Sequence, residues 1–523
     1  MSQPRVSPLS QWIALLATLF VVALLPLAAQ TAARPAPVRS NAEAATARYL
    51  ASIQNQPLLL LAFVREMPKG ADLHNHLSGG IYAESFLRWA SQDGRCIDRR
   101  TVTVVAPPCD AAQGRPSAAD AYHDDLLYRA AIDAWSMRDF VPSAGNSGHD
   151  HFFDTFDKFG LADKGHTGDM LAEVMHDAAE QHILYLELMD TLAGGPAGAL
   201  ASQVGWDPDF ARLRNKLLPG LPAVLAEAGR ELDAADEQQR ADLHCGTPQA
   251  DAGCGVDVRF LYQVLRGLPP QVVFTQMLTG FELASRDPRV VGLNMVMPED
   301  GYTSMHDFRL HMAMLDYLHG IYPNVHISLH AGELAPGMVP PDGLRFHIRA
   351  SIEQGHAQRI GHGVDVMEED RPFELLHEMA QRHVLVEICL TSNKVILGIE
   401  GKNHPLPIYL RNHVPVALAT DDAGVSRSTM SREFLRAEET YHLSYPTLKT
   451  MVRDSLDHAF VQGSSLWTVP EDFHPVAACV HDTPGESHIS AACSRYLQAN
   501  EKARLEWQEE IALRRFEHHV ATQ

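Results

Sequence analysis

Eight short apolar runs, each ending in polar residues, constrain the fold of this 523-residue chain most strongly. They are rich in β-branched residues, and amphipathic segments such as 305–318 and 368–382 lie between most of them. The runs are 71–76, 183–190, 256–265, 290–297, 325–330, 359–362, 384–390 and 416–421. Apolar strands that alternate with helices are typical of a parallel sheet covered by helices. Eight repeats therefore predict an α/β protein with a (β/α)₈ TIM barrel.

The connections between these runs predict how the chain divides into parts. The barrel would span 67–463, and the long connection after its first strand would hold an inserted loop subdomain at about 90–135. A linker and N-terminal helix would precede the barrel at 31–66, and a helical C-terminal extension would follow at 464–523. Individual helices are expected near 42–66, 448–460 and 497–518.

The beginning of the chain predicts export. Arg5 is the only charged side chain before the apolar run 12–25, which Pro26 and small residues follow. A basic start, an apolar stretch and a small-residue tail are typical of a signal peptide. We therefore expect a signal peptide at 1–30, cleaved between about 29 and 33, and a secreted or periplasmic protein without a stable membrane partner. An uncleaved membrane anchor is the alternative, for which the run is slightly short.

The seven cysteines fit an oxidising destination. Six form sequence-local couples in polar stretches rich in Gly, Pro or Asp, where a short disulfide restricts the unfolded chain. The couples are Cys96 with Cys109, Cys245 with Cys254, and Cys479 with Cys493. Local pairing is our expectation, although six cysteines allow many connectivities. Cys389 lies in an apolar run and is expected to be a buried thiol.

The charge balance excludes some classes of partner. The chain has 43 Lys+Arg against 65 Asp+Glu, a formal charge of −22 with His neutral. Binding to nucleic-acid phosphates needs clustered basic residues, and no basic run is present. An anionic membrane surface is disfavoured for the same reason. A small neutral or cationic substrate is compatible with this charge.

Metal-ligating residues gather at the ends of the predicted strands, where a barrel carries its catalytic groups. His74 and His76 end the first run, and their i, i+2 spacing directs both imidazoles to one face of a strand. His330 ends the fifth run, and Asp421 ends the eighth. Three imidazoles and one carboxylate suit a zinc ion, one per chain. Taken singly, each His has a structural or surface role as its alternative.

Three further strand-end groups suit proton transfer. Glu333 follows His330 closely and suits a proton donor, with an ordinary helix N-terminal Glu as the alternative. His362, between two glycines, suits a base acting on water. Asp422 adjoins Asp421, and a solvated turn is its alternative role. Among the other histidines, His326 is expected in the core or beside the site, and His347, His356, His404 and His413 in loops or helices.

With these residues assembled, the chain resembles the adenosine deaminase family, most closely its secreted, growth-factor-like branch. The matching segments occur in family order. They are 67–76 (MPKGADLHNH), 328–333 (SLHAGE), 359–363 (RIGHG), 387–393 (EICLTSN), 403–405 (NHP) and 420–422 (TDD). The export signal, the Cys-bearing insert and 184–187 (LYLE) resemble the secreted branch more than the cytosolic enzymes.

The resemblance implies an enzyme, a zinc hydrolase that converts adenosine or 2′-deoxyadenosine to inosine or 2′-deoxyinosine and ammonia. Glu333 would share a proton with purine N1, His362 would orient and deprotonate the attacking water, and Asp422 would hydrogen-bond N7. The zinc ligands would be His74, His76, His330 and Asp421.

This chain departs from the family pattern at substrate-contact positions. Ser78 stands where cytosolic members carry a sugar-binding Asp. Met297, Pro298 and Glu299 replace a segment whose Gly backbone faces the purine, and Ala423 replaces a Pro. Ser78 and Met297 are therefore expected to contact the substrate together with Asp422.

These departures keep alternative functions open. One is a related zinc aminohydrolase acting on adenine or a modified adenosine. Another is a non-catalytic extracellular protein that binds adenosine, for which a proton donor such as Glu333 would be unnecessary. The insert or the C-terminal tail could also serve a homodimer.

Overall fold

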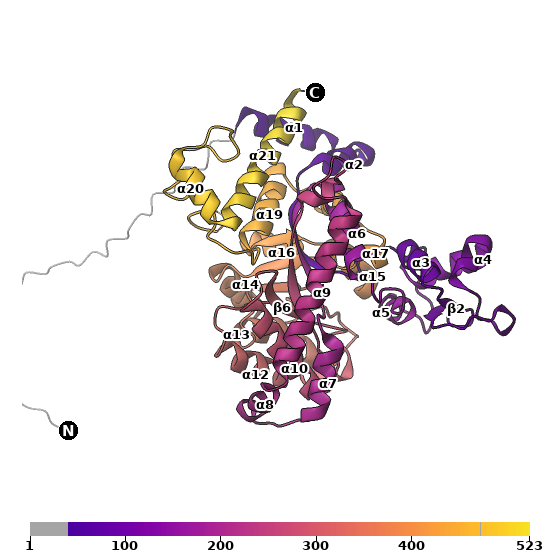
Figure 1. Cartoon of the computed structure of the whole chain (residues 1–523). Coiled ribbons are helices and arrows are strands. Elements are labelled where there is room, and N and C mark those ends of the chain that lie inside the picture. Colours follow the sequence, from indigo (N-terminus) through magenta and orange to yellow (C-terminus); the bar gives the residue numbers. More distant parts are fainter. Residues whose placement is uncertain (1–39, 471, 523) are drawn as a thin grey trace, which may run out of the picture. The chain divides into compact units, whose positions relative to one another are not determined.

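Eight parallel strands form a nearly closed barrel, and their order around the sheet follows the sequence. Helices cover the outside of this barrel (Figure 1). A computed structural model describes residues 40–470 and 472–522. The strands are β1 (Gly70–His76), β4 (Ile183–Asp190), β5 (Asp257–Leu265), β6 (Val290–Val296), β7 (His326–Ala331), β8 (Arg359–His362), β9 (Leu385–Ile388) and β10 (Val416–Leu418). The predicted TIM barrel is confirmed, and each predicted run overlaps one of these strands.

The first strand meets the segment that follows the last one. Asn75 and Asp421 form an isolated parallel bridge. The Asp421 amide donates to the carbonyl of His74 at 2.8 Å, and the His76 amide donates to the carbonyl of Asp421 at 3.2 Å. Asp421 lies three residues beyond the end of β10, with a φ of 58°. This contact carries Asp421 to the two histidines of β1.

Helices surround the barrel and bury their apolar faces against it. α10 is typical, because Phe274, Leu278 and Phe281 on its inner face are fully buried. Those that precede, follow or connect the strands are α6 (Thr167–Glu180), α10 (Pro270–Ala284), α11 (Tyr302–His306), α12 (Phe308–His319), α13 (His347–Glu353), α14 (Pro372–Gln381), α15 (Leu390–Leu397), α16 (Leu406–Arg411), α17 (Ala423–Ser426), α18 (Met430–Tyr441) and α19 (Tyr445–Asp457). Short 3₁₀ turns η4 (Pro341–Leu344) and η5 (Gly401–Asn403) lie in the loops.

Three predicted helices are each divided in the structure. The helix expected at 42–66 is α1 (Asn41–Ile53) followed by α2 (Pro57–Glu66). Pro57 explains that break, because proline lacks the amide a continuing helix needs but fits the first helical turn. The segment 305–318 contains the end of α11 and most of α12. The segment 497–518 contains the end of α20 (Ala491–Ala499) and most of α21 (Glu501–Thr522).

The long connection after β1 carries its own small elements. These are α3 (Ala83–Gln92), β2 (Cys96–Asp98), β3 (Thr103–Val105), η1 (Ala111–Gln113), η2 (Ala118–His123), α4 (Asp125–Ala134) and α5 (Gly148–Phe159). β2 and β3 pair antiparallel, and the Cys96–Cys109 disulfide closes the adjoining loop. The connection after β4 carries α7 (Gly194–Val204), α8 (Phe210–Leu217), α9 (Leu221–Asp242) and η3 (Ala252–Gly255). The residue boundaries of these parts stay predictions.

All three expected disulfides are present. The other two join Cys245 to Cys254 and Cys479 to Cys493. Cys389 is a buried free thiol, as expected.

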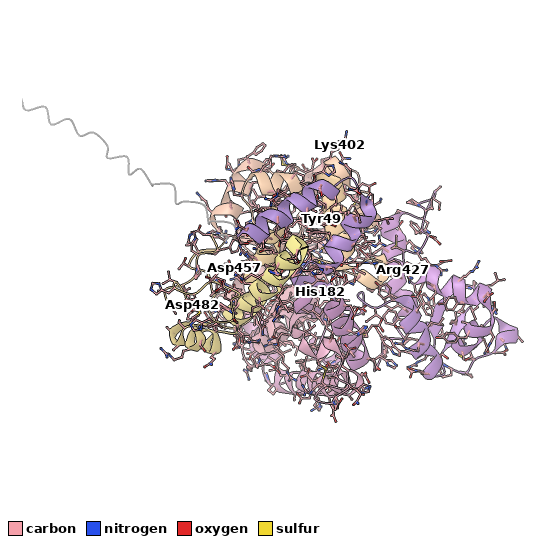
Figure 2. All side chains as sticks on the ribbon, turned by 90° about the horizontal axis from the view of Figure 1, so that it is seen from above. Tyr49, His182, Lys402, Arg427, Asp457 and Asp482 are labelled. Carbon is pink, nitrogen blue, oxygen red and sulfur yellow. A yellow bond between two sulfur atoms is a disulfide. The ribbon has the colours of Figure 1, made fainter. Side chains whose placement is uncertain are left out.

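The C-terminal helices pack across the end of the barrel where the strands begin. α21 lies beside α19 and α1, and Tyr49 marks α1 beside the yellow α21 (Figures 1 and 2). Lys449 of α19 bonds Glu517 of α21 at 2.6 Å, and Arg453 bonds Glu510 at 2.6 Å. These buried ion pairs connect the extension to the barrel.

The predicted signal peptide and most of the predicted linker lie outside the described residues. Within the described part of the chain, no helix has the length and apolar character needed to cross a membrane.

Candidate metal centre and active site

Three imidazoles and one carboxylate converge where the strands end. The Nε2 atom of His330 lies 3.1 Å from that of His74 and 3.2 Å from that of His76. Asp421 Oδ1 lies 3.5 Å from His74 Nε2 and 3.4 Å from His76 Nε2. Residues predicted from three separate strand ends thus form one group capable of holding a metal ion.

The second ring nitrogen of each histidine has a partner. His74 Nδ1 bonds Glu387 Oε2 at 2.6 Å. His76 Nδ1 bonds Gln263 at 2.8 Å. His330 Nδ1 bonds Asn294 at 2.9 Å. Such bonds orient a metal-ligating imidazole and fix its proton on the nitrogen away from the ion.

The donor set fits zinc in type and spacing. Donor atoms that sit about 2.0–2.1 Å from a zinc ion at tetrahedral corners lie about 3.3 Å from one another. The four separations above fall between 3.1 and 3.5 Å. His74, His330 and Asp421 are buried, and His76 is partly exposed. The residues present would therefore accommodate the ion.

A buried network of charged side chains holds the imidazole of His74 in place. Glu387 accepts from His74 and from Ser328, and it pairs with Arg359 at 2.7 Å. Arg359 also donates to Glu187 at 2.6 Å. Because buried charges are stable only when paired, each of these groups depends on the next. The chain thus fixes His74 through residues from several strands.

Glu333 and His362 face each other beside the metal ligands. His362 Nε2 lies 3.6 Å from Glu333 Oε1 and 3.9 Å from Asp421 Oδ2. Burial, with the charges of Asp421 and Glu299, raises the pKa of Glu333 well above its ordinary value. Burial lowers the pKa of His362 to about 3. The first shift favours the protonated form of Glu333 that a proton donor requires, and the second favours the neutral form of His362.

Asp422 points into the same site. Its side chain is buried, and burial together with Asp421 raises its pKa to about 8. Its Oδ1 atom has no hydrogen-bond partner among the described residues. A Cβ on Gly79 would lie 1.5 Å from that atom, so only glycine fits there.

A cavity of about 370 Å³ opens over this group. The predicted residues Ser78, Met297 and Asp422 all line it. Phe152, Phe153 and Phe156 of α5, with Ile396 and Pro298, give it a largely apolar wall. None of the described residues that line it is Lys or Arg.

Several supporting residues were not identified from the sequence. Glu299, considered only as a departure from the family pattern, accepts from the amides of Gly332 and Glu333 and from His347 Nδ1. Gln263 and Asn294 were overlooked as well. Their signal was present, because each is a polar residue inside an apolar strand of the barrel, where a buried polar side chain needs a partner.

Two histidines expected in loops or helices belong to the support of the site. His347 begins α13 and is buried against Glu299. His404 is buried and bonds Asn393, which bonds His362. His413 is exposed in a loop, as expected.

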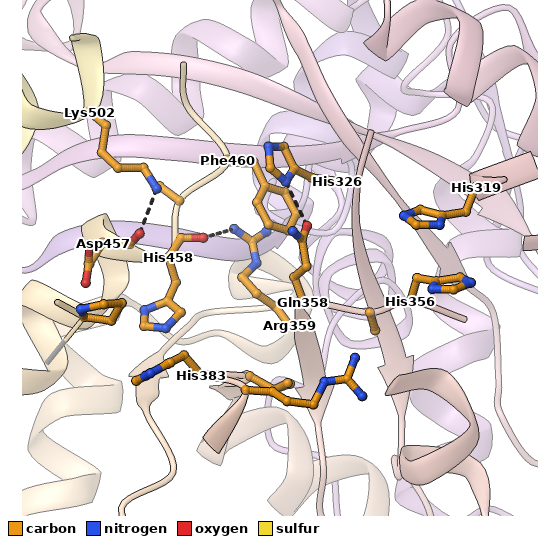
Figure 3. Close-up of a pocket in the computed structure, with 15 residues that line it drawn as sticks. His319, His326, His356, Gln358, Arg359, His383, Asp457, His458, Phe460 and Lys502 are labelled. Atoms are coloured by element: carbon orange, nitrogen blue, oxygen red, sulfur yellow. Dashed lines mark hydrogen bonds between the residues drawn. The ribbon is translucent and has the colours of Figure 1, made fainter. Parts of the chain in front are cut away.

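A second pocket, of about 420 Å³, lies at the opposite end of the barrel (Figure 3). Gln358 bonds His326 there at 2.8 Å, and Lys502 donates to the Asp457 carbonyl (Figure 3). His326 also stacks on Phe460, so it lies outside the metal group. Residues at this end of a TIM barrel serve stability more often than catalysis.

Comparison with known proteins finds similarity to adenosine deaminases. A family model described as adenosine deaminase matches residues 227–466. The adenosine deaminase of Mycobacteroides abscessus is 24% identical over 415 residues, which cover 77% of this chain and 92% of that protein.

Two further relatives match shorter segments. The adenine deaminase of a Chelativorans species is 27% identical over 264 residues, covering 48% of this chain and 75% of that protein. A protein of Dictyostelium discoideum named "probable adenosine deaminase" is 24% identical over 217 residues, covering 41% of this chain. That match spans only 26% of the Dictyostelium protein.

Proposed function

The chain belongs to the adenosine deaminase family, and on that basis we propose that it is a zinc-dependent hydrolase converting adenosine or 2′-deoxyadenosine to the corresponding inosine and ammonia. One observation carries the proposal. The metal group of His74, His76, His330 and Asp421 shares a cavity with Glu333, and burial raises the pKa of that carboxyl well above its ordinary value. A site that only binds a ligand has no need of a proton donor beside a metal group.

The ligand atoms would hold a zinc ion whose Lewis acidity makes water a nucleophile at neutral pH. Glu333 would give its proton to purine N1, which makes C6 electrophilic. His362 would contact the attacking water, and Asp422 would hydrogen-bond N7. Each of these side chains is buried, so solvent competes little with its contact to the substrate.

The lining of the cavity favours an uncharged nucleoside over a nucleotide. A phosphate group is normally bound by Lys, Arg or backbone amides, and the described lining residues include neither Lys nor Arg. Phe153 and Phe156 offer ring surface for a purine.

A second candidate substrate is adenine or another aminopurine. Ser78 replaces the Asp that binds the sugar in cytosolic family members, and Met297 lines the cavity. Both changes alter contacts to the sugar and the purine edge and leave the metal ligands unchanged.

Secretion to an oxidising compartment is part of the proposal. Its support is the set of three disulfides, because such bonds persist mainly outside the reducing cytosol. The basic and apolar start of the sequence agrees with it. The N-terminus of the exported protein, read by mass spectrometry, tests the predicted cleavage near residues 29–33.

Turnover assays test the proposal directly. Zinc-loaded protein is incubated with adenosine, 2′-deoxyadenosine, adenine and AMP, and purine absorbance and ammonia are followed. We expect deamination of the two nucleosides. Turnover of adenine alone would overturn the nucleoside assignment, and no turnover of any substrate would overturn deamination.

Glu333→Gln tests the role of Glu333 as the proton donor. It preserves the size of the side chain but removes the proton that N1 requires. We expect it to keep its zinc and lose most of its rate. Loss of zinc would instead identify Glu333 as a ligand or a support of the metal group.

A further inference from the structure

A chain of hydrogen bonds runs behind His362, away from the cavity. Its members are His404, Asn393 at the middle of α15, and His362 at the end of β8. His404 Nε2 lies 3.0 Å from Asn393 Oδ1, and Asn393 Nδ2 lies 3.0 Å from His362 Nδ1. All three side chains are buried, so water does not compete for these bonds.

A backbone amide fixes the direction of the first bond. The amide of Leu406 donates to His404 Nδ1 at 3.1 Å. A backbone N–H can only donate, so Nδ1 of His404 is an acceptor and carries no proton. His404 is therefore neutral with its proton on Nε2, which agrees with burial lowering its pKa to about 4. Its Nε2 atom donates to Asn393.

The side-chain amide of Asn393 continues the same donor-to-acceptor direction to His362. Its oxygen must face His404, because the opposite orientation would place two donors against each other. Its NH₂ group then faces His362 and donates to Nδ1. His362 Nδ1 is thus an acceptor, and the proton of the neutral imidazole lies on Nε2, the atom that faces Glu333 and Asp421.

The Nε2 atom of His362 points at the reacting region. It is buried and has no hydrogen-bond partner within the part of the chain that is described. Glu333 Oε1 at 3.6 Å and Asp421 Oδ2 at 3.9 Å flank it. An N–H in this position is available to an oxygen atom placed between these groups.

We infer that Asn393 and His404 are positioning residues that hold His362 as the Nε2–H tautomer, so that His362 donates a hydrogen bond to the attacking water oxygen and does not accept its proton. This inference rests on the proposed deamination. It changes the role expected from the sequence, in which His362 deprotonates the water.

The proton balance then involves Glu333. Once Glu333 has given its proton to N1, its carboxylate takes a proton from water as the O–C6 bond forms. That proton passes to the amino nitrogen, and the C6–N bond breaks to release ammonia. The remaining hydroxyl proton returns to Glu333 as the C6 carbonyl forms, which restores the starting acid.

Two variants distinguish the donor-to-acceptor direction of these hydrogen bonds from the mere presence of the bonds. In Asn393→Asp, the carboxylate accepts from both histidines, which places a proton on His362 Nδ1 and a lone pair on Nε2. In His404→Gln, the side-chain oxygen can accept from Leu406 and the NH₂ group can donate to Asn393. This second variant keeps the original direction.

We expect Asn393→Asp to lower kcat on the order of 10²-fold with a much smaller change in KM. Its activity should fall as the pH rises, because the imidazolium keeps a proton on Nε2, whereas the neutral ring beside the new carboxylate carries its proton on Nδ1. His404→Gln should stay within a few-fold of the parent with an unshifted profile, whereas His404→Leu should lose activity. Zinc content and thermal unfolding establish that each variant is folded and loaded.

A direct readout is independent of activity. In zinc-loaded protein labelled with ¹⁵N at histidine, and assigned by comparison with His362→Gln, the His362 shifts should identify Nε2 as protonated. Protonation at Nδ1 would overturn the inference even if deamination is confirmed. An Asn393→Asp variant with unchanged kcat and pH profile would also overturn it. The tautomer is readable even in a protein that fails to deaminate, so failure of the proposed function is distinguished.

Discussion

At the scale of single residues, the site depends on polar partners that orient the metal ligands. His76 reaches the metal group only in the orientation that Gln263 imposes on its Nδ1 atom. A metal-ligating histidine that loses such a partner typically loses about 10–100-fold in metal affinity.

We therefore expect Gln263→Leu to weaken zinc binding by about that factor, because the imidazole of His76 would no longer be fixed. Competition with a chelator of known affinity measures it. The matched control is Gln358→Leu, which removes the same kind of bond to His326 at the other end of the barrel. Equal affinity losses in both variants would contradict the argument.

Met297 adopts a backbone conformation that its side chain disfavours. Its φ is 84°, in the left-handed region, and its side chain is 37% exposed. Replacement by glycine removes the strain and sacrifices little burial. We expect Met297→Gly to raise the free energy of unfolding by about 1 kcal/mol in urea titrations. Met297→Ala keeps a Cβ at the same φ and should show no gain. If alanine stabilises equally, strain is not the cause.

At the scale of elements, α5 forms part of the wall of the cavity. It lies in the long connection after β1, yet it packs on α15, the helix that carries Asn393. A Cβ on Gly148 would lie 1.9 Å from the carbonyl of Val395, so glycine permits this close approach. The connection therefore contributes directly to the site.

Phe153 on α5 should affect substrate binding more than chemistry. We expect Phe153→Ala to raise KM for adenosine about tenfold, a loss of about 1.4 kcal/mol, because purine contact with the ring disappears. Zinc content and kcat should change little. Phe373→Ala on α14, exposed and away from the cavity, is the control. A large fall in kcat with unchanged KM would contradict a role in binding.

At the scale of the whole molecule, buried acids in the C-terminal helix couple stability to pH. Burial raises the pKa of both Glu506 and Glu509, on α21, to about 8. Between the ordinary pKa near 4.5 and pH 8, the folded chain binds more protons at these sites than the unfolded chain. Their contribution to the free energy of unfolding therefore falls as pH rises through that window.

Glu509→Gln isolates this effect, because glutamine stays neutral at every pH. Relative to the parent, the variant should gain stability progressively from pH 5 to pH 8, as measured by urea unfolding at several pH values. Glu374→Gln, at an exposed position of α14, serves as the control and should show no such trend. If the free energies of unfolding of the variant and the parent differ by the same amount at every pH, the Glu509 carboxyl ionises normally in the folded chain.

Much of the fold could be predicted because its signals are local. Each β-strand is a run of adjacent apolar residues, and each disulfide closes a loop of 9 to 14 residues. The ligands His74 and His76 share a strand, and the rule that catalytic groups lie at strand ends brought His330 and Asp421 to them. Helix breaks were predicted less well, because single residues such as Pro57 decide them.

The barrel, its strand-end ligands and its local disulfides follow from the order of the residues, since periodicity and spacing act between near neighbours. The residues that support those ligands come together only in the folded chain. His74 meets Glu387 across 313 positions, and His362 acquires its tautomer from an amide at Leu406 through two intervening side chains. The physical reason is that a buried hydrogen-bonding group must be satisfied by whichever partner the fold brings to it, and sequence distance does not limit that choice.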